Sequence, residues 1–355
     1  MLYSKLGNSG LVVSRLSLGA MTFAVSNTSA VAKTDRQAAD QLLGRAIEAG
    51  VNFIDTANIY SGGESETMLG EMIAGRRDGL VIATKAGWRA GGALNQSGLS
   101  RAHLLWSVEQ SLKRLGTDHV DVFIAHRDDV NTPLEETLEA LDTIVKHGKA
   151  RYLGVSNWPA WKIAAAVELQ RANGWAQFSH AQMMYSLVGR GVEDEVVPMM
   201  ARYGLGITAW SPLAGGFLSG KYDWETLKDP DNRLSGFDFI PFDKDQGFAL
   251  VERMRAIGEG HGASVAQVAL AWVLSKPVVS SVIVGASKLS QLDDNLAAAD
   301  LEMTAEELAE LDGLSAEPAR YPATVIGMLD QPIKKALASR PGAGFVPDPS
   351  QTSWS

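Results

Sequence analysis

The chain has 355 residues, of which 46% are hydrophobic and 21% are charged, an ordinary globular composition. Its net charge of -9 argues against electrostatic binding to nucleic acid or to a membrane, and its lack of cysteine excludes disulfides, a thiolate nucleophile and Cys-based zinc sites. The start of the chain lacks the apolar core of a signal peptide, and no uncharged apolar run reaches about 18 residues, so we expect a soluble, cytoplasmic protein.

The first elements along the chain are an expected hairpin, a strand and a helix. The hairpin closes at Gly7-Asn8-Ser9-Gly10, and the strand follows at about 15–19. Thr34 or Asp35 can cap the helix, and Gln37 can complete a capping box from Thr34. The buried stripe of this helix and its stop are supplied by Leu42, Leu43, Ala46, Ile47 and Gly50.

Seven further apolar runs predict strands, with helix-like segments between them. They lie at about 52–56, 80–85, 120–126, 151–156, 178–183, 206–210 and 280–284. One intervening helix begins at Thr132-Pro133-Leu134-Glu135, with a capping threonine and a proline in the first position. Eight strand and helix units predict an α/β fold, a closed (β/α)8 TIM barrel, rather than an open doubly wound sheet. Because no clear linker appears before residue 315, we expect residues 1–355 to form one barrel domain with an N-terminal β-hairpin and long loops at the carboxyl ends of the strands.

Two segments are longer than normal connections between elements. Residues 213–245 are rich in Gly, Asp, Pro and aromatic residues, and we expect them to form a lid over a bound ligand. Residues 317–355 are expected to form a C-terminal tail, partly ordered as a cap and ending in a floppy terminus.

Four polar residues, Asp55, Tyr60, Lys85 and His126, lie at or just beyond the ends of predicted strands. Parallel strands bring such residues to one face, where this set can reduce a carbonyl group with the help of a hydride donor. The phenol can supply a proton, a lysine ammonium beside it would lower its pKa of about 10, a carboxylate would orient the lysine, and an imidazole can polarise the substrate oxygen.

Each of the four has a structural interpretation when it is taken alone. Asp55 can cap a turn, Tyr60 can be a packed loop aromatic, Lys85 a solvated strand end and His126 a satisfied half-buried histidine. Their grouping near consecutive strand ends favours a catalytic site. The other five histidines show no metal-binding spacing, so no metal is expected.

Several motifs resemble those of the aldo-keto reductases. They are GVNFIDTANIY at 50–60, the segment 64–70, ATK at 83–85, GVSN at 154–157, WSPLAGG at 210–216, IVGASK at 283–288 and the segment 291–295. The resemblance covers about residues 3 to 315, in order. It implies a (β/α)8 barrel that binds a nicotinamide dinucleotide, usually the phosphorylated form, across the carboxyl ends of its strands.

The resemblance also implies roles for individual residues. Asp55, Tyr60, Lys85 and His126 match the catalytic tetrad, with Tyr60 as general acid. Around the nicotinamide, Ser156, Asn157 and Gln182 match positions that hold the carboxamide, and Trp210 matches the aromatic that stacks on the ring. The implied pyrophosphate contacts are Ser211, Leu213, Gly215 and Lys221, and the implied adenosine contacts are Gly285, Ser287, Lys288, Gln291, Asp294 and Asn295. Further expected cofactor contacts are Met21, Asp55, Pro212, Gly216 and, in the lid, Arg233.

The chain departs from the family pattern in two places. Gln291 stands where many members have an arginine that grips the 2′-phosphate, so Lys288, Lys221 or Arg233 must supply the cation. We expect NADP as cofactor, with a moderate preference for NADPH over NADH. In the second departure, Ala20-Met21 replaces an aromatic that often lines the substrate site. An apolar pocket could be walled by Trp88, Trp158, Tyr185 and Phe217, although ordinary packing explains each of them equally well.

Three functions compete. The leading hypothesis is an NADP(H)-dependent oxidoreductase that reduces an aldehyde or ketone to an alcohol, reversibly. Its expected partner is a small-molecule carbonyl or alcohol substrate, and the sequence does not define its oligomeric state. The alternative is a cofactor-binding regulatory subunit, because the sequence is also similar to the β subunits of voltage-gated potassium channels, especially around 210–222. Those subunits often lack the histidine of the tetrad, so His126 favours the enzyme. A barrel glycosidase would need two paired carboxylates, and nothing in the sequence pairs any two.

One nucleotide-binding motif is misleading. Residues 204–209, GLGITA, formally fit the dinucleotide-binding pattern G-x-G-x-x-A. That motif must follow a strand and open a helix, whereas here it precedes a predicted strand. We therefore interpret it as a helix stop and a tight turn, and a Rossmann domain is not expected.

Overall fold

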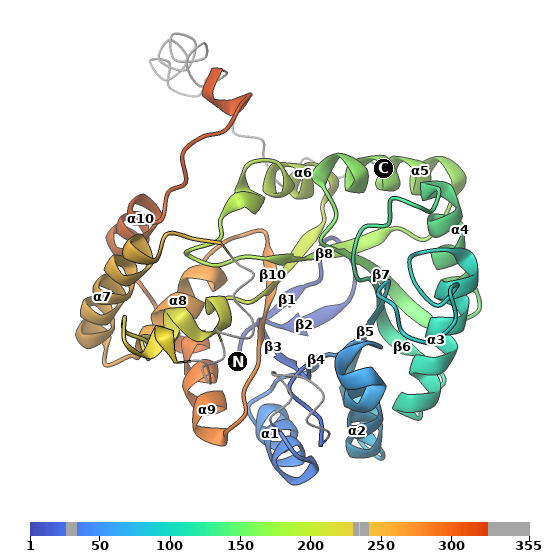
Figure 1. Ribbon diagram of the computed structural model, residues 1–355, viewed down its shortest axis with the longest axis horizontal. Coiled ribbons are helices and arrows are strands. Elements are labelled where there is room, and N and C mark those ends of the chain that lie inside the picture. The colour runs from blue at the N-terminus through green and yellow to red at the C-terminus, as the bar shows by residue number, and fades with distance from the viewer. Residues whose placement is uncertain (26–33, 230–233, 235–240, 326–355) are drawn as a thin grey trace.

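The computed structural model describes residues 1–25, 34–229, 234 and 241–325 of the chain. Within them, eight parallel strands close into a barrel, which confirms the predicted (β/α)8 fold (Figure 1). In their order around the barrel, the strands are β10 (Val279–Val284), β3 (Leu16–Gly19), β4 (Phe53–Asp55), β5 (Val81–Ala86), β6 (Val120–Ala125), β7 (Ala150–Ser156), β8 (Phe178–Met184) and β9 (Gly206–Trp210). Each lies close to a predicted apolar run, because strands of a parallel sheet are buried on both faces.

Helices surround the barrel on its outer side (Figure 1). They are α1 (Arg36–Glu48), α2 (Glu64–Ile73), α3 (Arg101–Leu115), α4 (Leu134–Lys146), α5 (Ala160–Asn173), α6 (Val196–Tyr203), α7 (Lys244–His261), α8 (Val265–Leu274), α9 (Leu289–Ala297) and α10 (Ala305–Leu314). None of the helices in the described ranges is both long enough and apolar enough to cross a membrane.

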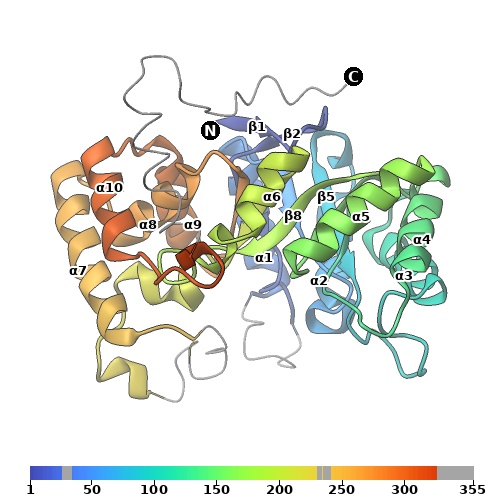
Figure 2. The ribbon, with the colours of Figure 1, turned by 90° about the horizontal axis from the view of Figure 1, so that it is seen from above.

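An N-terminal hairpin closes one end of the barrel, as the sequence predicts. Its strands β1 (Tyr3–Lys5) and β2 (Val12–Ser14) pair antiparallel. An apolar plug inside the barrel joins this hairpin to the strands, and its buried members are Leu6, Val13, Phe53, Val81, Ala83, Val122 and Ile124. Figure 2 shows the hairpin at one end and the loops that follow the strands at the other. With one end plugged by apolar side chains, a polar site has room only at the carboxyl ends of the strands.

Two glycines allow close packing near that site. A Cβ atom on Gly70 of α2 would lie 2.5 Å from the backbone oxygen of Arg114, so α2 approaches α3 closely only with glycine there. Inside the barrel, a Cβ atom on Gly154 would lie 2.4 Å from the His180 ring. The His180 ring therefore occupies the space beside Gly154, directly below the strand ends.

The structure selects one of the two predicted caps of α1, without the capping box from Thr34, and corrects the predicted cap of α4. Asp35, and not Thr34, caps α1, because its carboxylate accepts a hydrogen bond from the Ala38 N–H at 2.9 Å. Thr34 instead pairs its backbone with residues 22–24, a long-range contact that the local pattern does not reveal. At α4, Pro133 occupies the cap position, and the Thr132 hydroxyl donates to Asp129 at 2.7 Å instead of capping the helix.

The GLGITA motif has the predicted structural role. Gly204 ends α6 in the left-handed conformation, with φ of +71°, and β9 follows at once. A left-handed residue after the last turn is a common helix stop that glycine adopts without strain.

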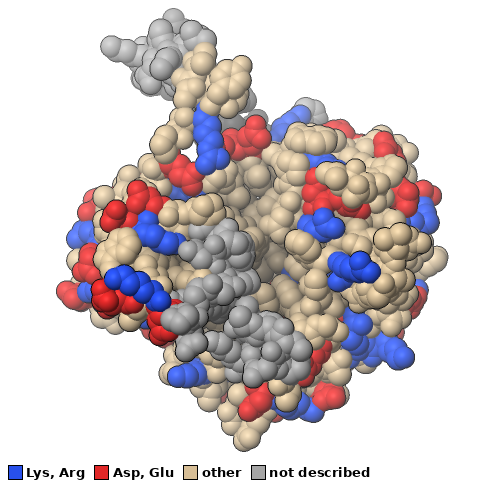
Figure 3. Space-filling model, in the orientation of Figure 1, with Lys and Arg blue, Asp and Glu red and all other residues tan. Residues whose placement is uncertain are grey.

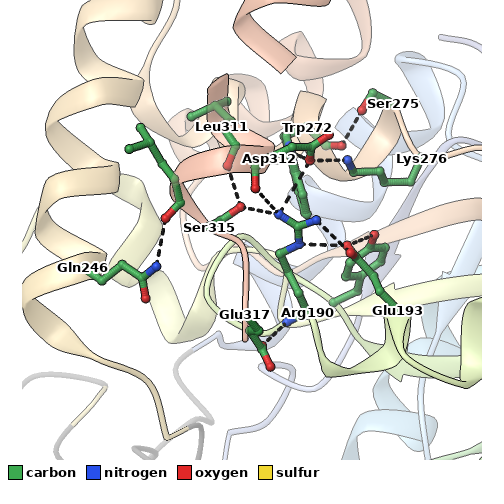
Figure 4. Close-up of polar contacts among 12 residues, drawn as sticks. Arg190, Glu193, Gln246, Trp272, Ser275, Lys276, Leu311, Asp312, Ser315 and Glu317 are labelled. Carbon is green, nitrogen blue, oxygen red and sulfur yellow. Dashed lines mark hydrogen bonds and ion pairs between the residues drawn. The ribbon is translucent and has the colours of Figure 1, made fainter. Parts of the chain in front are cut away.

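The two long segments are described only in part. Residues 213–245 contain two short 3-10 helices, η4 (Ala214–Ser219) and η5 (Thr226–Lys228), while 230–233 and 235–240 lie outside the described residues, so the lid stays a prediction. The tail is described as far as residue 325. At its start, Arg190, Asp312, Ser315 and Glu317 connect the end of α10 to the loop after β8 (Figure 4).

Candidate active site

The four tetrad residues lie together at the carboxyl ends of β4, β5 and β6. Asp55 is the last residue of β4, Lys85 lies in β5 and His126 directly follows β6. Tyr60 begins η1 (Tyr60–Gly63), the turn after β4. Because these strands are neighbours in the barrel, their ends meet at one face. Figure 3 shows that face, with charged side chains mainly around the rim and uncharged residues toward the centre.

Lys85 is the centre of the site. Its side chain is fully buried, and its ammonium donates to Asp55 Oδ2 at 2.7 Å, to the backbone oxygen of Thr56 at 2.7 Å and to Tyr60 Oη at 3.0 Å. All three of its N–H donors are therefore used. Burial alone would lower the pKa of Lys85, but Asp55 and Tyr60 together raise it above its ordinary value, so the lysine stays charged.

Tyr60 is held in its neutral form. Burial raises the pKa of Tyr60 above its ordinary value, Lys85 acts in the opposite direction and Asp55 adds to the rise. The expected effect of the lysine is thus present, but desolvation outweighs it in this structure. Since the Lys85 ammonium donates to the phenol oxygen, the phenol keeps its own proton for another acceptor.

His126 stands edge-on to Tyr60. Its ring centroid lies 5.9 Å from that of Tyr60, with the planes at 80°. Its pKa lies well below the ordinary value because of burial first and then the positive charges of Lys85 and Arg127. The imidazole is therefore neutral at physiological pH and can donate one N–H to a substrate oxygen.

Gln182 contacts the tetrad directly, which the sequence reasoning missed. Its side-chain Nε2 donates to Asp55 Oδ1 at 2.8 Å, so each carboxylate oxygen of Asp55 has its own partner. The Ser156 hydroxyl in turn donates to the backbone oxygen of Gln182 at 2.9 Å. Gln182 thereby fixes the carboxylate that fixes the lysine.

A second buried ion pair supports the site from behind. Glu66 of α2 is fully buried, accepts from Arg114 Nε at 2.7 Å and also accepts from the Thr84 hydroxyl, next to Lys85. A Cβ atom on Gly63 would lie 2.8 Å from the Arg114 side chain, so the guanidinium fits only over glycine. Glu66 lies in the 64–70 motif and Gly63 directly before it, so the motif marked the region without revealing the role of Glu66.

The residues expected around the nicotinamide form one connected group. Asn157 has a positive φ of +58° directly after β7, and its Nδ2 donates to Ser156 Oγ at 2.9 Å and to the backbone oxygen of His126 at 3.3 Å. Its Oδ1 accepts from Trp210 Nε1 at 3.1 Å. Met21 follows β3 and is partly exposed. The structure thus brings Ser156, Asn157 and Trp210 to the strand ends beside His126.

The segment after β9, where pyrophosphate contacts are expected, forms a tight turn with several left-handed residues. Ser211, Ala214, Gly215 and Gly216 all have positive φ, from +47° to +97°, and Pro212 and Leu213 lie between them. Two of these are not glycines, and such strain is commonly found at ligand sites. A Cβ atom on Gly216 would lie 3.1 Å from Lys221 Nζ, so this ammonium lies beside the turn. The N–H groups of Ala214, Gly215 and Gly216 donate within the turn, to Ser211 O, Ser211 Oγ and Leu213 O respectively, so the group that this segment offers to an anion is the Lys221 ammonium.

The expected adenosine end lies at the start of α9. Ser287 donates from its backbone N–H and its hydroxyl to Gln291 Oε1, at 3.0 and 3.1 Å, and Lys288 is exposed at the cap position. Gly285 is exposed nearby, and Asn295 is 5% exposed. Asp294 is turned toward α8, where it accepts from Ser264 and Gln267 at 2.9 and 2.7 Å. Arg233 lies outside the described residues.

Of the four aromatic residues considered as pocket walls, three are packing residues. Trp158, Tyr185 and Phe217 are at most 2% exposed and pack against Phe178, Trp272 and Phe242 respectively. Trp88 differs, because it is 43% exposed and stands edge-on to His126, with 6.4 Å between the ring centroids. The structure therefore places only Trp88 of this set beside the tetrad.

Comparison with known proteins agrees with this architecture. Residues 15–316 match the Aldo/keto reductase family. The chain belongs to that family, which supports an oxidoreductase built on this barrel. The part of the chain that the structure describes contains no cluster of three or more histidine, aspartate or glutamate side chains suited to a metal ion.

The relatives include channel subunits as well as an oxidoreductase. A protein of Oryza sativa subsp. japonica described as a probable voltage-gated potassium channel subunit beta is 39% identical over 310 residues, which cover 85% of this chain and 92% of the relative. A protein of Arabidopsis thaliana with the same description is 37% identical over the same shares. A protein of Bacillus subtilis (strain 168) described as an uncharacterized oxidoreductase is 36% identical over 89% of this chain and 96% of its own length.

Proposed function

We propose that the protein is an NADP(H)-dependent oxidoreductase that reduces an aldehyde or ketone to an alcohol, and that the reaction is reversible. The observation that carries the proposal is the fully buried Lys85, bonded at once to Asp55 and to the Tyr60 phenol. A buried charge is costly unless it is paired. Here the charge is placed where it stabilises the phenolate that remains after the phenol gives up its proton.

Each residue of the tetrad has a part in the proposed reaction. A bound nicotinamide would supply the hydride that the carbonyl carbon needs. Tyr60 donates its hydroxyl proton to the carbonyl oxygen, and Lys85 stabilises the negative charge left on the phenol oxygen. Asp55, fixed by Gln182, keeps the lysine in place. His126 donates an N–H to the same carbonyl oxygen and so orients the substrate.

The proposed cofactor site begins at Met21 and at the residues expected around the nicotinamide, and it ends at the start of α9. Ser156, Asn157, Gln182 and Trp210 hold the nicotinamide, and the turn 211–216 with Lys221 holds the pyrophosphate. Residues 285–295, with Lys288 as the cation, hold the adenosine end and its 2′-phosphate. The Lys221 ammonium beside the strained turn supports this assignment, since a cation suits an anion and such strain is commonly found at ligand sites. Residues 213–245 cover the cofactor in this proposal.

The direct test follows the hydride. The full chain is mixed with NADPH that carries deuterium at the transferable nicotinamide position and with a nitrobenzaldehyde. We expect the NADPH absorbance to fall and the benzyl alcohol product to contain one deuterium at its carbinol carbon. An alcohol without the label, or tight NADPH binding without any alcohol, would contradict the proposed reaction.

A second candidate function is a cofactor-binding regulatory subunit without significant turnover. It is favoured by the 39% and 37% identical plant relatives described as probable channel subunits beta. The same experiment distinguishes the two functions, because a regulatory subunit would bind NADPH without transferring the label. The complete tetrad, including His126 beside Tyr60, supports the enzyme.

A further inference from the structure

An arginine lies beside the proposed proton-transfer site without a part in it. Arg127 follows His126, is half-buried, and stacks its guanidinium on Trp88, with 4.9 Å from Cζ to the ring centroid. Its Nε donates to the backbone oxygen of Gly87 at 3.1 Å, which fixes the plane of the guanidinium. Trp88 also stands edge-on to His126, so the Trp88 ring connects Arg127 to the tetrad.

The acids nearest in sequence to Arg127 are engaged elsewhere. Asp128 is paired with Lys162. Asp129 is 5% exposed, and its carboxylate accepts hydrogen bonds from the Leu99 N–H at 2.7 Å, from the Asn131 N–H and from the Thr132 hydroxyl. Among the residues that the structure describes, no carboxylate lies within ion-pair distance of Arg127. Asp129 is close enough only for a longer-range interaction.

The remaining N–H groups of Arg127 are underused. One terminal nitrogen donates to the backbone oxygen of Asp128 at 3.3 Å, a long bond, and Nε bonds to Gly87. A guanidinium has five N–H donors in one plane, which match the two oxygens of a carboxylate. Lys85 does not compete for such a ligand, because its charge is already paired with Asp55. A half-buried, oriented and unpaired cation at the mouth of a site is suited to an anionic part of the substrate.

We propose that Arg127 binds a carboxylate of the substrate, so that the site prefers aldehydes and ketones that carry a carboxylate on a flat or short carrier. This inference rests on the proposed function. The exposed face and edge of Trp88 would contact the carrier between the carboxylate and the carbonyl group. In the reaction the carboxylate is unchanged, while the carbonyl carbon gains the hydride and the carbonyl oxygen gains the Tyr60 proton. Arg127 is thus a specificity-determining residue.

The test compares charged and neutral forms of the same aldehydes. The full chain with NADPH is assayed with 3- and 4-carboxybenzaldehyde and with their methyl esters, and kcat/KM is measured for each. In Arg127→Met, the ratio of acid to ester should fall by roughly 10- to 100-fold for at least one isomer, the scale of a hydrogen bond between charged groups. Comparing the ratio between wild type and variant cancels the different intrinsic reactivities of acid and ester.

Two controls make the result interpretable. Arg151→Met removes an exposed arginine near the start of β7, at the opposite end of the barrel, and should leave the ratio unchanged. In the wild type, added salt should raise KM for the acid more than for the ester, a measurement that stands even if Arg127→Met fails to fold. The inference is wrong if Arg127→Met keeps the wild-type ratio of kcat/KM for acid to ester, or if salt does not raise KM for the acid more than for the ester. In either case, turnover of the esters by the wild type leaves the proposed function intact. Failure to reduce either form would instead contradict the proposed function.

Discussion

Two tyrosines in this molecule each lie beside a cation, yet their hydroxyl protons are committed differently. Tyr60 accepts a hydrogen bond from Lys85, so its proton remains available to another acceptor. The Tyr185 hydroxyl donates a hydrogen bond to Glu193 Oε1 at 2.6 Å. Burial is the largest cause that raises the pKa of Tyr185 far above the ordinary value, and the Glu193 carboxylate is the next. The same side chain therefore keeps its hydroxyl proton free of Lys85 in one place and uses it in an internal hydrogen bond in the other.

The surroundings of Tyr185 explain its structural role. Arg190 makes a two-pronged ion pair with Glu193, at 2.9 and 2.8 Å, and also donates to the Asp312 backbone oxygen and the Ser315 hydroxyl. The Asp312 carboxylate accepts from Trp272 Nε1 at 2.9 Å and from Lys276 at 2.6 Å. Figure 4 shows this cluster joining α8, the end of α10 and the loop after β8. Because its donors are largely used, the cluster locks elements together and has little capacity left for a ligand.

The comparison predicts opposite effects for two identical substitutions. Tyr60→Phe should slow carbonyl reduction by roughly 10²- to 10⁴-fold, since it removes the general acid. It should leave NADPH binding and thermal stability nearly unchanged. Tyr185→Phe is the matched control, and it should keep turnover while losing stability, because Glu193 loses a donor. Single-turnover rates and thermal unfolding of both variants provide the check, and a Tyr60→Phe rate above about a tenth of the wild-type rate would contradict the assignment of the acid.

Lys85→Met tests how the cation affects the phenol. The lysine charge favours the phenolate, so its removal leaves burial and Asp55 unopposed, and both raise the pKa of Tyr60. Alcohol oxidation needs the phenolate as base, so the pH at which its rate rises should move upward. Both directions should slow by roughly 10²-fold.

A companion variant separates this effect from simple damage to the fold. Lys85→Met leaves the Asp55 carboxylate buried without its cation, which destabilises the protein. The double variant Asp55→Asn with Lys85→Met removes that uncompensated charge and should recover stability without recovering rate. If the pH profile of Lys85→Met matched that of the wild type, Lys85 would be only a structural residue of the strand.

The strands and the tetrad could be predicted because the information for them is local. A parallel strand is an uninterrupted apolar run, and a polar residue at its end faces the open end of the barrel. That rule brought Asp55, Lys85 and His126 to one face. It did not reveal Gln182 as a partner of Asp55, because that contact joins residues 127 positions apart.

Long-range packing also decides what the local patterns left open. Trp158, Tyr185 and Phe217 are aromatic, but residue type alone does not say whether a ring faces the site or the helices. Thr34 is a good helix cap by local pattern, yet its backbone pairs with residues 22–24 and Asp35 caps instead. The Arg190 cluster was not anticipated at all, since its members come from three distant segments.

Arg190→Met tests the claim that the second cluster is a lock. The substitution leaves Glu193 without its ion-pair partner and frees the end of α10. Because the Arg190 side chain is 13% exposed and its partner 30%, we expect a loss of about 2–3 kcal/mol in the free energy of unfolding, less than for a fully buried pair. Denaturant unfolding measures this. The control Arg253→Met, which removes the exposed pair with Glu310, should change stability little. A large loss of turnover at temperatures where Arg190→Met is folded would contradict a purely structural role.

Lys288 extends the comparison to an exposed cation. It has no ion pair among the described residues and lies at the cap of α9, beside Ser287. An ammonium next to a hydroxyl suits the 2′-phosphate of NADPH, while Gln291, bonded to Ser287, cannot make the two-pronged contact of an arginine. Lys288→Ala should therefore weaken NADPH binding by about 1.5 kcal/mol, or roughly tenfold, at the low end for charged hydrogen bonds because solvent screens the site. NADH lacks the phosphate, so its dissociation constant should hardly change.

Lys113→Ala, on the exposed side of α3, serves as the matched control and should affect neither cofactor. Fluorescence titration of both cofactors decides the point, since equal losses for NADPH and NADH would mean that Lys288 does not contact the phosphate and that Lys221 or Arg233 provides the cation instead.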